Sequence, residues 1–334
     1  MAPQPSFLLR RLSQSAIVLL AVSMCAFGLA ELAPGDPFTA EQLDSSFSEA
    51  TFERLRQRAG LEDPLPIRYG RWLASVARGE LGISIAHGRP VVDLLLPRLA
   101  ATLTLTVLAS TAAWLLALGL GAWGARRPDG LIDRAGMSLV STLQATPELL
   151  LALLAAALAL RLGLPVSGMA SLDADSYGTV GRLVDRLRHL FLPVSVLTLA
   201  SLPPLLRHTR AAMEEAFHSS HVLAARARGL SEQRVFLGYV LPLAANPLIS
   251  LFGISFGALV SGSLVVEVVL GWPGVGPLML EAVFARDLHV IVAGTLCAGA
   301  FLLAGNTVAD LALHRLDPRL ESQLEHEPGA GAAR

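Results

Sequence analysis

The stretch "ATLTLTVLASTAAWLLALGLGAWGA", residues 101–125, runs without a single charged side chain. About 20 consecutive apolar residues are enough for a helix to cross the roughly 30 Å hydrocarbon core of a bilayer. This stretch therefore predicts a transmembrane helix. Five further stretches of the same kind predict an all-α, polytopic membrane protein with six spans, the others covering approximately residues 12–33, 137–162, 189–206, 246–270 and 289–313.

The stretch 189–206 is the weakest of these candidates because it is short and contains prolines. Pro193, Pro203 and Pro204 all lie within it. A spanning helix tolerates proline only where neighbouring groups satisfy the backbone atoms that proline leaves without a partner. The prediction of this span therefore depends on close packing against its neighbours.

The composition of the whole chain supports a membrane protein. Of the 334 residues, 53% are hydrophobic and 16% are charged, whereas a soluble domain carries roughly 25% charged residues. The chain lacks the polar surface that a water-exposed globule would need. Its net charge of −1 offers no general basic surface to nucleic acid, so we expect a lipid bilayer and no nucleic acid among its surroundings.

Arginine distribution predicts the orientation. Short loops on the cytoplasmic side of membrane proteins are enriched in lysine and arginine. The loops that would share a side with both chain ends hold most of the arginines in short loops, among them Arg126, Arg207 and Arg228. We therefore predict that both termini are cytoplasmic.

The predicted spans divide the chain into three regions. Residues 1–100 form the N-terminal span and an outer (periplasmic) segment. Residues 101–320 form a core of five spans, with cytoplasmic helices near 211–242. Residues 321–334 form a cytoplasmic tail, rich in Gly and Ala, which we expect to be disordered.

The outer segment is predicted to contain short amphipathic helices. Apolar residues recur at helical spacing in 47–58 and in 67–78, where Trp72, Leu73 and Val76 form the apolar face. Residues 88–99 are expected to lie as an interfacial helix that leads into the second span.

Residues 211–242 lie between the fourth and fifth predicted spans. Residues 213–228 lack proline and glycine and are rich in Ala, Glu and Arg, which predicts a helix. Gly229 is expected to end it as a C-cap, and Ser231 can cap a second helix that ends at Leu241-Pro242. This second helix carries an apolar stripe of Val235, Phe236, Tyr239 and Val240.

Two short helices with a fixed elbow would form a knob that suits a groove on another protein. In this interpretation the apolar stripe, the small alanines and the arginines all face the cytoplasm. The alternative for arginines such as Arg207 and Arg210 is that they only follow the positive-inside tendency.

This segment matches the cytoplasmic signature of a known family. The signature reads Glu-Ala-Ala, three residues, Gly, nine residues, Ile, one residue, Leu-Pro, and "ARARGL" (residues 225–230) is similar to the form of its peptide/nickel branch. The chain here resembles the inner-membrane permease subunits of ATP-binding-cassette importers, with Leu223 and Tyr239 in place of the usual glutamate and isoleucine. The resemblance implies contact with an ATPase through Ala224, Ala225, Arg226, Arg228, Gly229, Leu230, Tyr239, Leu241 and Pro242.

The resemblance extends along most of residues 10–320. Blocks similar to the peptide/nickel branch occur in the family's order, among them "APGDP" (33–37), "GELGIS" (79–84), "VVEVVLGWPGVGPLMLEAVFARD" (265–287) and "LDPRL" (316–320). The resemblance implies a type I importer permease core in a bacterial inner membrane. It also implies partners: a second homologous permease subunit, two ATP-binding subunits and an extracytoplasmic solute-binding protein.

The energy source follows from the residue types present. A phosphate-binding loop ends in Gly-Lys-Ser/Thr, and the chain contains no lysine. If ATP drives transport, it must be hydrolysed on a separate protein, so we expect no enzyme activity, no cofactor and no metal in this subunit. The resemblance implies di- or oligopeptides as cargo, with nickel or another small solute as the alternative.

Two other function classes are less well supported. An ion-coupled secondary transporter would need ionisable residues deep in its spans, for which Glu148, Glu267, Asn306 and Asp310 are the candidates. Glu148 can alternatively bond a backbone group freed by Pro147. An intramembrane hydrolase is disfavoured because the chain has no Gly-x-Ser-x-Gly elbow.

Two groups of residues are candidates for the pathway and its outer gate. Thr102, Thr106 and Ser110 share one helix face. Each hydroxyl either bonds the carbonyl one turn earlier or hydrates the cargo. Residues 271–277, "GWPGVGP", cannot continue a helix, and the turn is expected on the outer side. For the gate the resemblance adds Glu267, Trp272, Pro273, Gly274 and Gly276.

Overall fold

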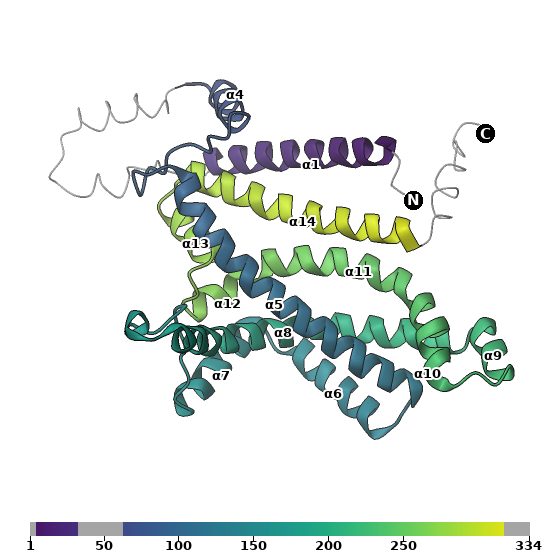
Figure 1. Cartoon of the computed structure of the whole chain (residues 1–334). Helices are drawn as coiled ribbons and strands as arrows, with labels where there is room; N and C mark the ends of the chain where they lie inside the picture. Colours follow the sequence, from purple (N-terminus) through teal and green to yellow (C-terminus); the bar gives the residue numbers. More distant parts are fainter. Residues whose placement is uncertain (1–4, 33–62, 317–334) are drawn as a thin grey trace, which may run out of the picture.

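The computed structural model describes residues 5–32 and 63–316, most of them helical. Within these ranges there is no strand, only an isolated bridge between Ile83 and Pro90. The expected helix at 47–58 and the tail at 321–334 lie outside them. The elements are α1 (Pro5–Leu32), α4 (Leu65–Val76), α5 (Val91–Arg126), α6 (Leu131–Ala145), α7 (Glu148–Arg161), η1 (Ala174–Ser176), α8 (Thr179–Phe217), α9 (Ser220–Ala227), α10 (Glu232–Val235), η2 (Phe236–Val240), α11 (Leu241–Gly262), α12 (Leu264–Val269), α13 (Val275–Phe284) and α14 (Leu288–Leu316) (Figure 1).

The described residues contain five helices that are long and apolar enough to cross a bilayer. They correspond to the first, second, fourth, fifth and sixth predicted spans: α1, α5, α8, the helical run 232–269 and α14. A sixth crossing exists if the bent pair α6–α7 counts as one span. The proline-containing fourth span is longer than predicted, because α8 continues through all three prolines for 39 residues.

The third predicted span, 137–162, is not a straight helix. Its residues divide between α6 and α7, whose axes differ by 105°. The break falls at Thr146-Pro147, where Thr146 has the extended conformation φ −93°, ψ 118°. The proline ring disfavours a helical conformation for the residue before it. α7 has 14 residues, about 21 Å of helix at 1.5 Å per residue, which is shorter than the hydrocarbon core.

The expected helix at 88–99 is not a separate element. From Val91 onward its residues form the first turns of α5, which continues unbroken to Arg126. The reason is packing: Val91 and Leu95 are buried in one apolar cluster with Leu278 of α13 and Val290 of α14. These contacts hold the beginning of the helix in line with the rest of the span.

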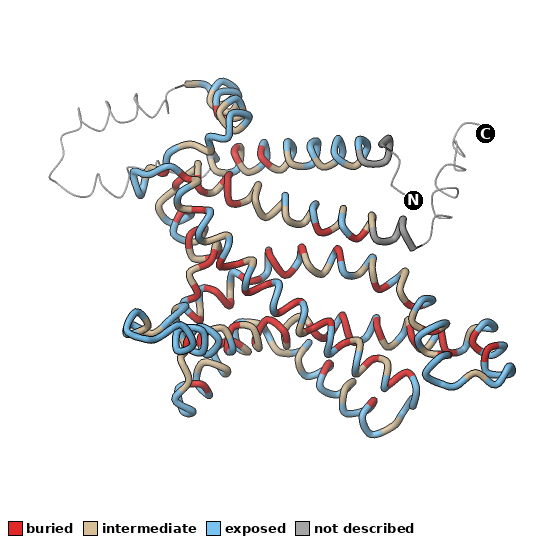
Figure 2. Tube along the Cα trace, viewed as in Figure 1, coloured by how far each residue is buried: buried red, intermediate tan, exposed pale blue. Residues whose placement is uncertain are grey.

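α5 and α8 pack along each other and form the centre of the molecule. The buried face of α5 repeats every four residues and consists mostly of small side chains, which let two helices approach closely. At Gly121 an added Cβ would lie 2.8 Å from Thr209 Cγ2 of α8. Figure 2 shows buried residues following both helices through the middle. The face comprises Ala101, Leu105, Ala109, Ala113, Ala117, Gly121 and Ala125.

The remaining spans are joined by close packing and by one ion pair. α11 packs on α14, where a Cβ at Gly257 would lie 2.9 Å from Leu302 Cα. α1 packs on α14, and Arg11 contacts Asp310 at 2.7 Å. α4 lies near the C-terminal end of α1, where Tyr69 OH is 2.8 Å from Ser23 Oγ. The predicted amphipathic helix at 67–78 is therefore confirmed, with Trp72 as its buried residue.

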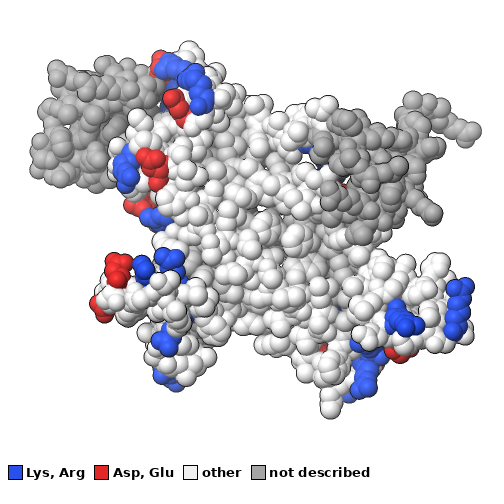
Figure 3. All heavy atoms as spheres, viewed as in Figure 1, with Lys and Arg blue, Asp and Glu red and all other residues white. Residues whose placement is uncertain are grey.

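Charged side chains on the face shown in Figure 3 gather at the two ends of the molecule and leave the middle without charge. α9 and α10 lie at one end, together with the beginning of α1 and the end of α14 (Figure 1). α4, α12 and α13 lie at the other end. An uncharged belt between two charged ends is the pattern expected of a chain that crosses a bilayer.

Candidate functional site

Two regions hold most of the predicted site residues, and they lie at opposite ends of the molecule. The inner segment (residues 219–242) contains α9, α10 and η2. The predicted helix 213–228 is in fact two helices, because α8 ends at Phe217 and α9 begins at Ser220. Ser219 separates them as an N-cap whose Oγ accepts a hydrogen bond from the Val222 N–H at 3.4 Å.

Gly229 forms the elbow of the inner segment and has a positive φ of 76°. Its N–H donates to the Arg226 carbonyl at 2.9 Å, and the Leu230 N–H donates to the Ala225 carbonyl at 3.4 Å. This pair of bonds is a Schellman cap, which needs a left-handed residue at this position. The predicted C-cap is therefore present, and no atom lies within 4 Å of where a Cβ would stand.

The second helix does not end at Leu241-Pro242, contrary to the prediction from the sequence. α10 continues through the π-helical turn η2 directly into α11. The Leu241 N–H donates to the Phe236 carbonyl, five residues earlier. Proline lacks an N–H and its ring crowds the carbonyl one turn back. The wider π turn just before Pro242 accommodates this ring, so the chain remains helical.

The faces of the inner segment differ from the prediction. The expected outward apolar stripe is turned inward: Val235 and Val240 are fully buried, and Phe236 and Tyr239 are half-buried. They pack with Met213 and other residues of the helix ends. Of the predicted contact residues, Ala225 is buried and Leu230 and Leu241 are half-buried. The exposed ones are Ala224, Arg226, Arg228, Gly229 and Pro242.

Aromatic residues attach the inner segment to the spans. The Phe236 ring contacts two groups from span ends: the Arg126 guanidinium of α5, 4.2 Å from its centroid, and the Phe217 ring of α8, with the two centroids 6.2 Å apart. Arg226 stands over Phe217 at 5.7 Å and makes two hydrogen bonds to Glu232, at 2.9 and 3.0 Å. These contacts join the inner segment to the ends of α5 and α8.

Sequence analysis missed an ion cluster beside this attachment. The Arg210 guanidinium of α8 bonds both carboxylate oxygens of Asp133 on α6, at 2.6 and 2.9 Å, and also Glu214 at 2.8 Å. An added Cβ at Gly124 of α5 would lie 2.6 Å from Asp133 Oδ1. The cluster joins the ends of three helices. The spacing of Arg210 and Glu214, four residues apart on one helix, was its only signal in the sequence.

The second region, the outer turn (residues 267–277), is organised by the Glu267 carboxylate, which is completely buried. Its Oε1 accepts hydrogen bonds from Thr102 Oγ1 at 2.7 Å and Ser263 Oγ at 3.0 Å. Its Oε2 accepts from the Gly276 N–H at 2.7 Å. Thr102 Oγ1 in turn accepts from the Val275 N–H at 2.8 Å. A buried carboxylate is stable only when such donors surround it.

The glycines of the outer turn leave room for this carboxylate. A Cβ at Gly274 would collide with Glu267 Oε2, and one at Gly276 would lie 2.8 Å from the same oxygen. Trp272 is buried, and its Nε1 donates to the Ala101 carbonyl at 3.1 Å. Pro273 is half-buried. Three predicted gate residues, Thr102, Gly274 and Gly276, therefore meet around the carboxylate of a fourth, Glu267, and the Trp272 backbone N–H donates to the Glu267 backbone carbonyl at 2.8 Å.

The other two hydroxyls of the predicted pathway face are buried within the chain. Thr106 is fully buried and its Oγ1 donates to the Thr102 carbonyl at 2.8 Å. This is the structural alternative that the spacing left open. Ser110 is 3% exposed. Neither hydroxyl faces open space in this structure.

A second buried carboxylate at the outer end also went unnoticed. Asp287 Oδ2 accepts hydrogen bonds from Ser84 Oγ at 2.6 Å and from the Ala86 N–H at 3.2 Å. Asp287 stands directly before α14 and joins the block at 79–84 to the block at 265–287, which are far apart in the chain. An acidic residue before an apolar helix is a recognisable cap signal, but its partner Ser84 could not be read from the sequence.

The candidates for ion coupling are placed in three different settings. Glu148 is the half-buried first residue of α7, Glu267 belongs to the outer turn, and Asp310 contacts Arg11. They do not form a common site. The described residues contain no group of three or more His, Cys, Asp or Glu side chains that could hold a metal ion.

Two family models match the chain. Residues 117–322 match the binding-protein-dependent transport system inner membrane component, and residues 5–106 match the N-terminal membrane component of binding-protein-dependent transport systems. The oligopeptide transport system permease protein AppB of Bacillus subtilis (strain 168) is 33% identical over 320 residues, covering 95% of this chain and 99% of that protein. The dipeptide transport system permease protein DppB of Escherichia coli (strain K12) is 27% identical over 332 residues, covering 94% and 98%.

A solved structure matches at the level of fold. The crystal structure of an amino acid ABC transporter with histidines superposes with a TM-score of 0.50 at 19% identity, over 67% of this chain and 94% of that chain. The expected all-α permease core is therefore confirmed.

Proposed function

Because the chain belongs to the family of binding-protein-dependent transport system inner membrane components, we propose that it is the permease subunit of an ATP-driven importer of di- and oligopeptides. The observation that carries the proposal is its similarity, over 94–95% of its length, to permeases named for oligopeptide and dipeptide transport. The two family models match residues 5–106 and 117–322, which include the N-terminal span, the inner segment and the outer turn.

Family membership itself establishes the broader properties. The chain is an inner-membrane protein that crosses the bilayer several times and works with ATP-hydrolysing and solute-binding partners. It has no ATPase site of its own, because ATP is hydrolysed on the partner subunits of such systems. The complete absence of lysine is consistent with this, since a phosphate-binding loop requires one.

The inner segment is the proposed contact with the ATPase. Its exposed surface combines small and basic residues with Leu223, which is 56% exposed, while its buried side is fixed to the ends of α5 and α8. A segment whose exposed surface can bind a partner and whose buried side is fixed to α5 and α8 can transmit a displacement of the partner to these two helices. Transport would then follow from a two-state change between inward- and outward-open forms, biased by nucleotide on the partners.

The outer turn is the proposed outer gate. The Glu267 network joins α12, α13 and α5, so the turn would move as one body with the outer end of α5. The second permease of the assembly is proposed to be a homologous chain rather than a second copy of this one. Both termini are proposed to be cytoplasmic, on the same side as the inner segment.

Reconstitution tests the proposed function. The chain is co-expressed with its partner subunits, purified, and placed in proteoliposomes with ATP on the ATPase side. We expect ATP-dependent accumulation of radiolabelled dialanine and trialanine when the binding protein is present on the other side. Vesicles without ATP provide the control. Import of radioactive nickel without any import of peptide would overturn the peptide assignment.

Labelling tests the orientation. We expect a cysteine introduced by Arg228→Cys to react with a membrane-impermeant maleimide only in inside-out vesicles, since Arg228 is exposed on the inner segment. Reaction only in intact cells freed of the outer membrane would place the inner segment on the external side. It would then be unable to meet a cytoplasmic ATPase.

A further inference from the structure

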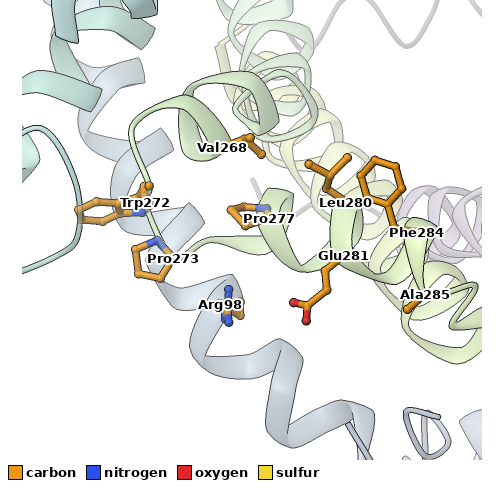
Figure 4. A pocket seen from close by; sticks show the side chains of 10 residues that line it. Arg98, Val268, Trp272, Pro273, Pro277, Leu280, Glu281, Phe284 and Ala285 are labelled. Atoms are coloured by element: carbon orange, nitrogen blue, oxygen red, sulfur yellow. The ribbon is translucent and has the colours of Figure 1, made fainter. Parts of the chain in front are cut away.

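An open groove of about 630 Å³ lies on the outer turn and extends along α13 and α5, beyond the Glu267 network. It is formed between α5 on one side and α12, the outer turn and α13 on the other (Figure 4). Its volume lies within the roughly 300–1,000 Å³ that small-molecule sites occupy. The residues that define it are Arg98, Trp272, Pro277, Leu280, Glu281 and Phe284.

Two opposite charges border this groove. Arg98 comes from α5 and Glu281 from α13, and both line the groove (Figure 4). No ion pair joins them, and within the described ranges Arg98 has no hydrogen-bonded or ionic partner. Among the described residues the Glu281 carboxylate pairs with one group, the His87 ring, whose Nε2 lies 3.3 Å from Oε1, and the Glu281 side chain is 55% exposed. Both charges are therefore available to a ligand.

The rest of the lining is apolar and partly rigid. Phe284 is 78% exposed and Val268 is 37% exposed, so they offer apolar surface to a ligand side chain. Trp272 is turned into the interior, where its hydrogen bond to Ala101 fixes the indole. Because the Glu267 network holds the adjoining turn, the wall of the groove is already in place before any ligand arrives.

We propose that this groove binds the two charged ends of a free peptide, the α-carboxylate at Arg98 and the α-ammonium at Glu281. This inference rests on the proposed function and names a site for its substrate. Every short unmodified peptide carries both end charges, whatever its sequence. Arginine bonds a carboxylate through two parallel N–H groups. The apolar lining would accept varied side chains, so the groove recognises peptides as a class.

A binding experiment tests the carboxylate end. The purified assembly, without the binding protein, is placed in nanodiscs, and binding of radiolabelled trialanine is measured by equilibrium dialysis. We expect Arg98→Gln to weaken binding about tenfold, equivalent to about 1.4 kcal/mol, and Arg98→Lys to recover part of the loss. Arg89→Gln changes an exposed arginine nearby in sequence and outside the groove, and should leave binding unchanged.

Capped peptides separate the two charges. Trialanine amide lacks the carboxylate, so it should bind the unmodified protein weakly and be insensitive to Arg98→Gln. N-acetyl-trialanine should in the same way be insensitive to Glu281→Gln, with Glu80→Gln as the exposed acidic control. Yield of the assembly and its basal ATPase rate show that each variant is folded. Equal weakening of capped and free peptides by either substitution would overturn the assignment of the ends.

Photo-crosslinking tests whether a peptide or another protein occupies the groove. A benzophenone amino acid replaces Phe284 in the complete transporter with its binding protein. We expect labelled trialanine to be captured, and excess unlabelled trialanine to prevent it. Capture of only the partner permease or the binding protein would show that the groove is a protein interface and overturn the inference.

The two proposals fail in different ways. If the unmodified assembly imports trialanine but Arg98→Gln binds it normally, the groove is not the site, and the proposed function stands. If the unmodified assembly imports no peptide at all, both proposals fail.

Discussion

The inner segment and the outer turn both require glycine, but for opposite reasons. At Gly229 a Cβ would meet nothing within 4 Å, and the residue is needed because its φ is 76°. At Gly274 the backbone φ is −91°, which other residues adopt, yet a Cβ would collide with Glu267 Oε2. Glycine is therefore needed in the inner segment for its backbone conformation, and in the outer turn because there is no room for a side chain.

The same contrast appears in what holds each region together. The outer turn depends on buried hydrogen bonds to one carboxylate, which water and salt cannot reach. The inner segment depends on apolar contacts, an aromatic stack and exposed pairs such as Arg226–Glu232. Exposed pairs contribute little to stability. The outer turn, which is the proposed gate, and the inner segment, which is the proposed contact with the ATPase, are thus built from different interactions.

The largest expected effect comes from removing the Glu267 carboxylate. Glu267→Leu removes the carboxylate that accepts from Thr102 Oγ1 and the Gly276 N–H, whereas Ser263 Oγ still reaches the Val260 carbonyl at 3.2 Å. Each unsatisfied group costs about 1–3 kcal/mol, so we expect a loss of about 2–6 kcal/mol. Thermal unfolding in detergent, followed by size-exclusion fluorescence, measures it.

Glu80→Leu, at an exposed position, is the control for this change and should keep its unfolding temperature. An unchanged unfolding temperature in Glu267→Leu would mean that the outer turn does not depend on the carboxylate. The proposed distinction between the two regions would then be lost.

The glycines allow the two regions to be compared directly. Gly274→Ala forces a side chain against Glu267 and Thr102, and overpacking typically costs about 1–3 kcal/mol. Gly229→Ala adds no contact and carries only the left-handed strain of about 1–2 kcal/mol. We expect Gly274→Ala to lower the unfolding temperature more than Gly229→Ala. The reverse order would contradict the contrast between volume and backbone.

The function of the elbow can be separated from stability by the choice of side chain. Gly229→Val places a β-branched residue at positive φ, where it is a genuine outlier, whereas asparagine tolerates this conformation. We expect Gly229→Val to insert in the membrane normally but to lose ATP-driven peptide uptake, and Gly229→Asn to retain most of it. Uptake and ATPase rate are measured on the same proteoliposomes. Normal uptake in Gly229→Val would show that the elbow takes no part in coupling.

The smallest expected effect concerns the attachment of the inner segment to α5. Arg126→Gln removes the cation from the Phe236 ring, an interaction worth about 0.5–1 kcal/mol at an exposed site. We expect a small drop in unfolding temperature. Arg127→Gln, at the neighbouring exposed position, should show none. Equal effects of the two variants would mean that only net charge matters there.

Local signals in the sequence predicted much of the fold. The long apolar runs identified five spans directly, because helix length and bilayer thickness are linked. The position of Gly229 predicted a left-handed cap, and Trp72 with its neighbours predicted α4. In each case the determining interaction lies within a few residues of the signal.

The features that the sequence missed depend on contacts between distant segments. The apolar stripe that contains Val235 and Val240 was predicted correctly, but the sequence did not show that the ends of other helices would cover it. Thr102 and Glu267 were both candidates, yet nothing in the sequence joins two residues that lie so far apart along the chain. The bend at Thr146-Pro147 was missed because a proline within an apolar run can either kink a span or break it.

The length of α5 has a mechanical consequence. Thr102 near its beginning bonds the Glu267 carboxylate, and Arg126 at its end stands over Phe236, so one rod touches both regions, about 36 Å apart at 1.5 Å per residue. If this rod rocks about a fulcrum near its midpoint, a tilt of about 10° swings its two ends by about 3 Å in opposite senses. In such a tilt the two ends of α5 cannot move in the same direction. The same displacement that admits cargo from one compartment would bar the way to the other, which is how a membrane avoids a leak during each stroke.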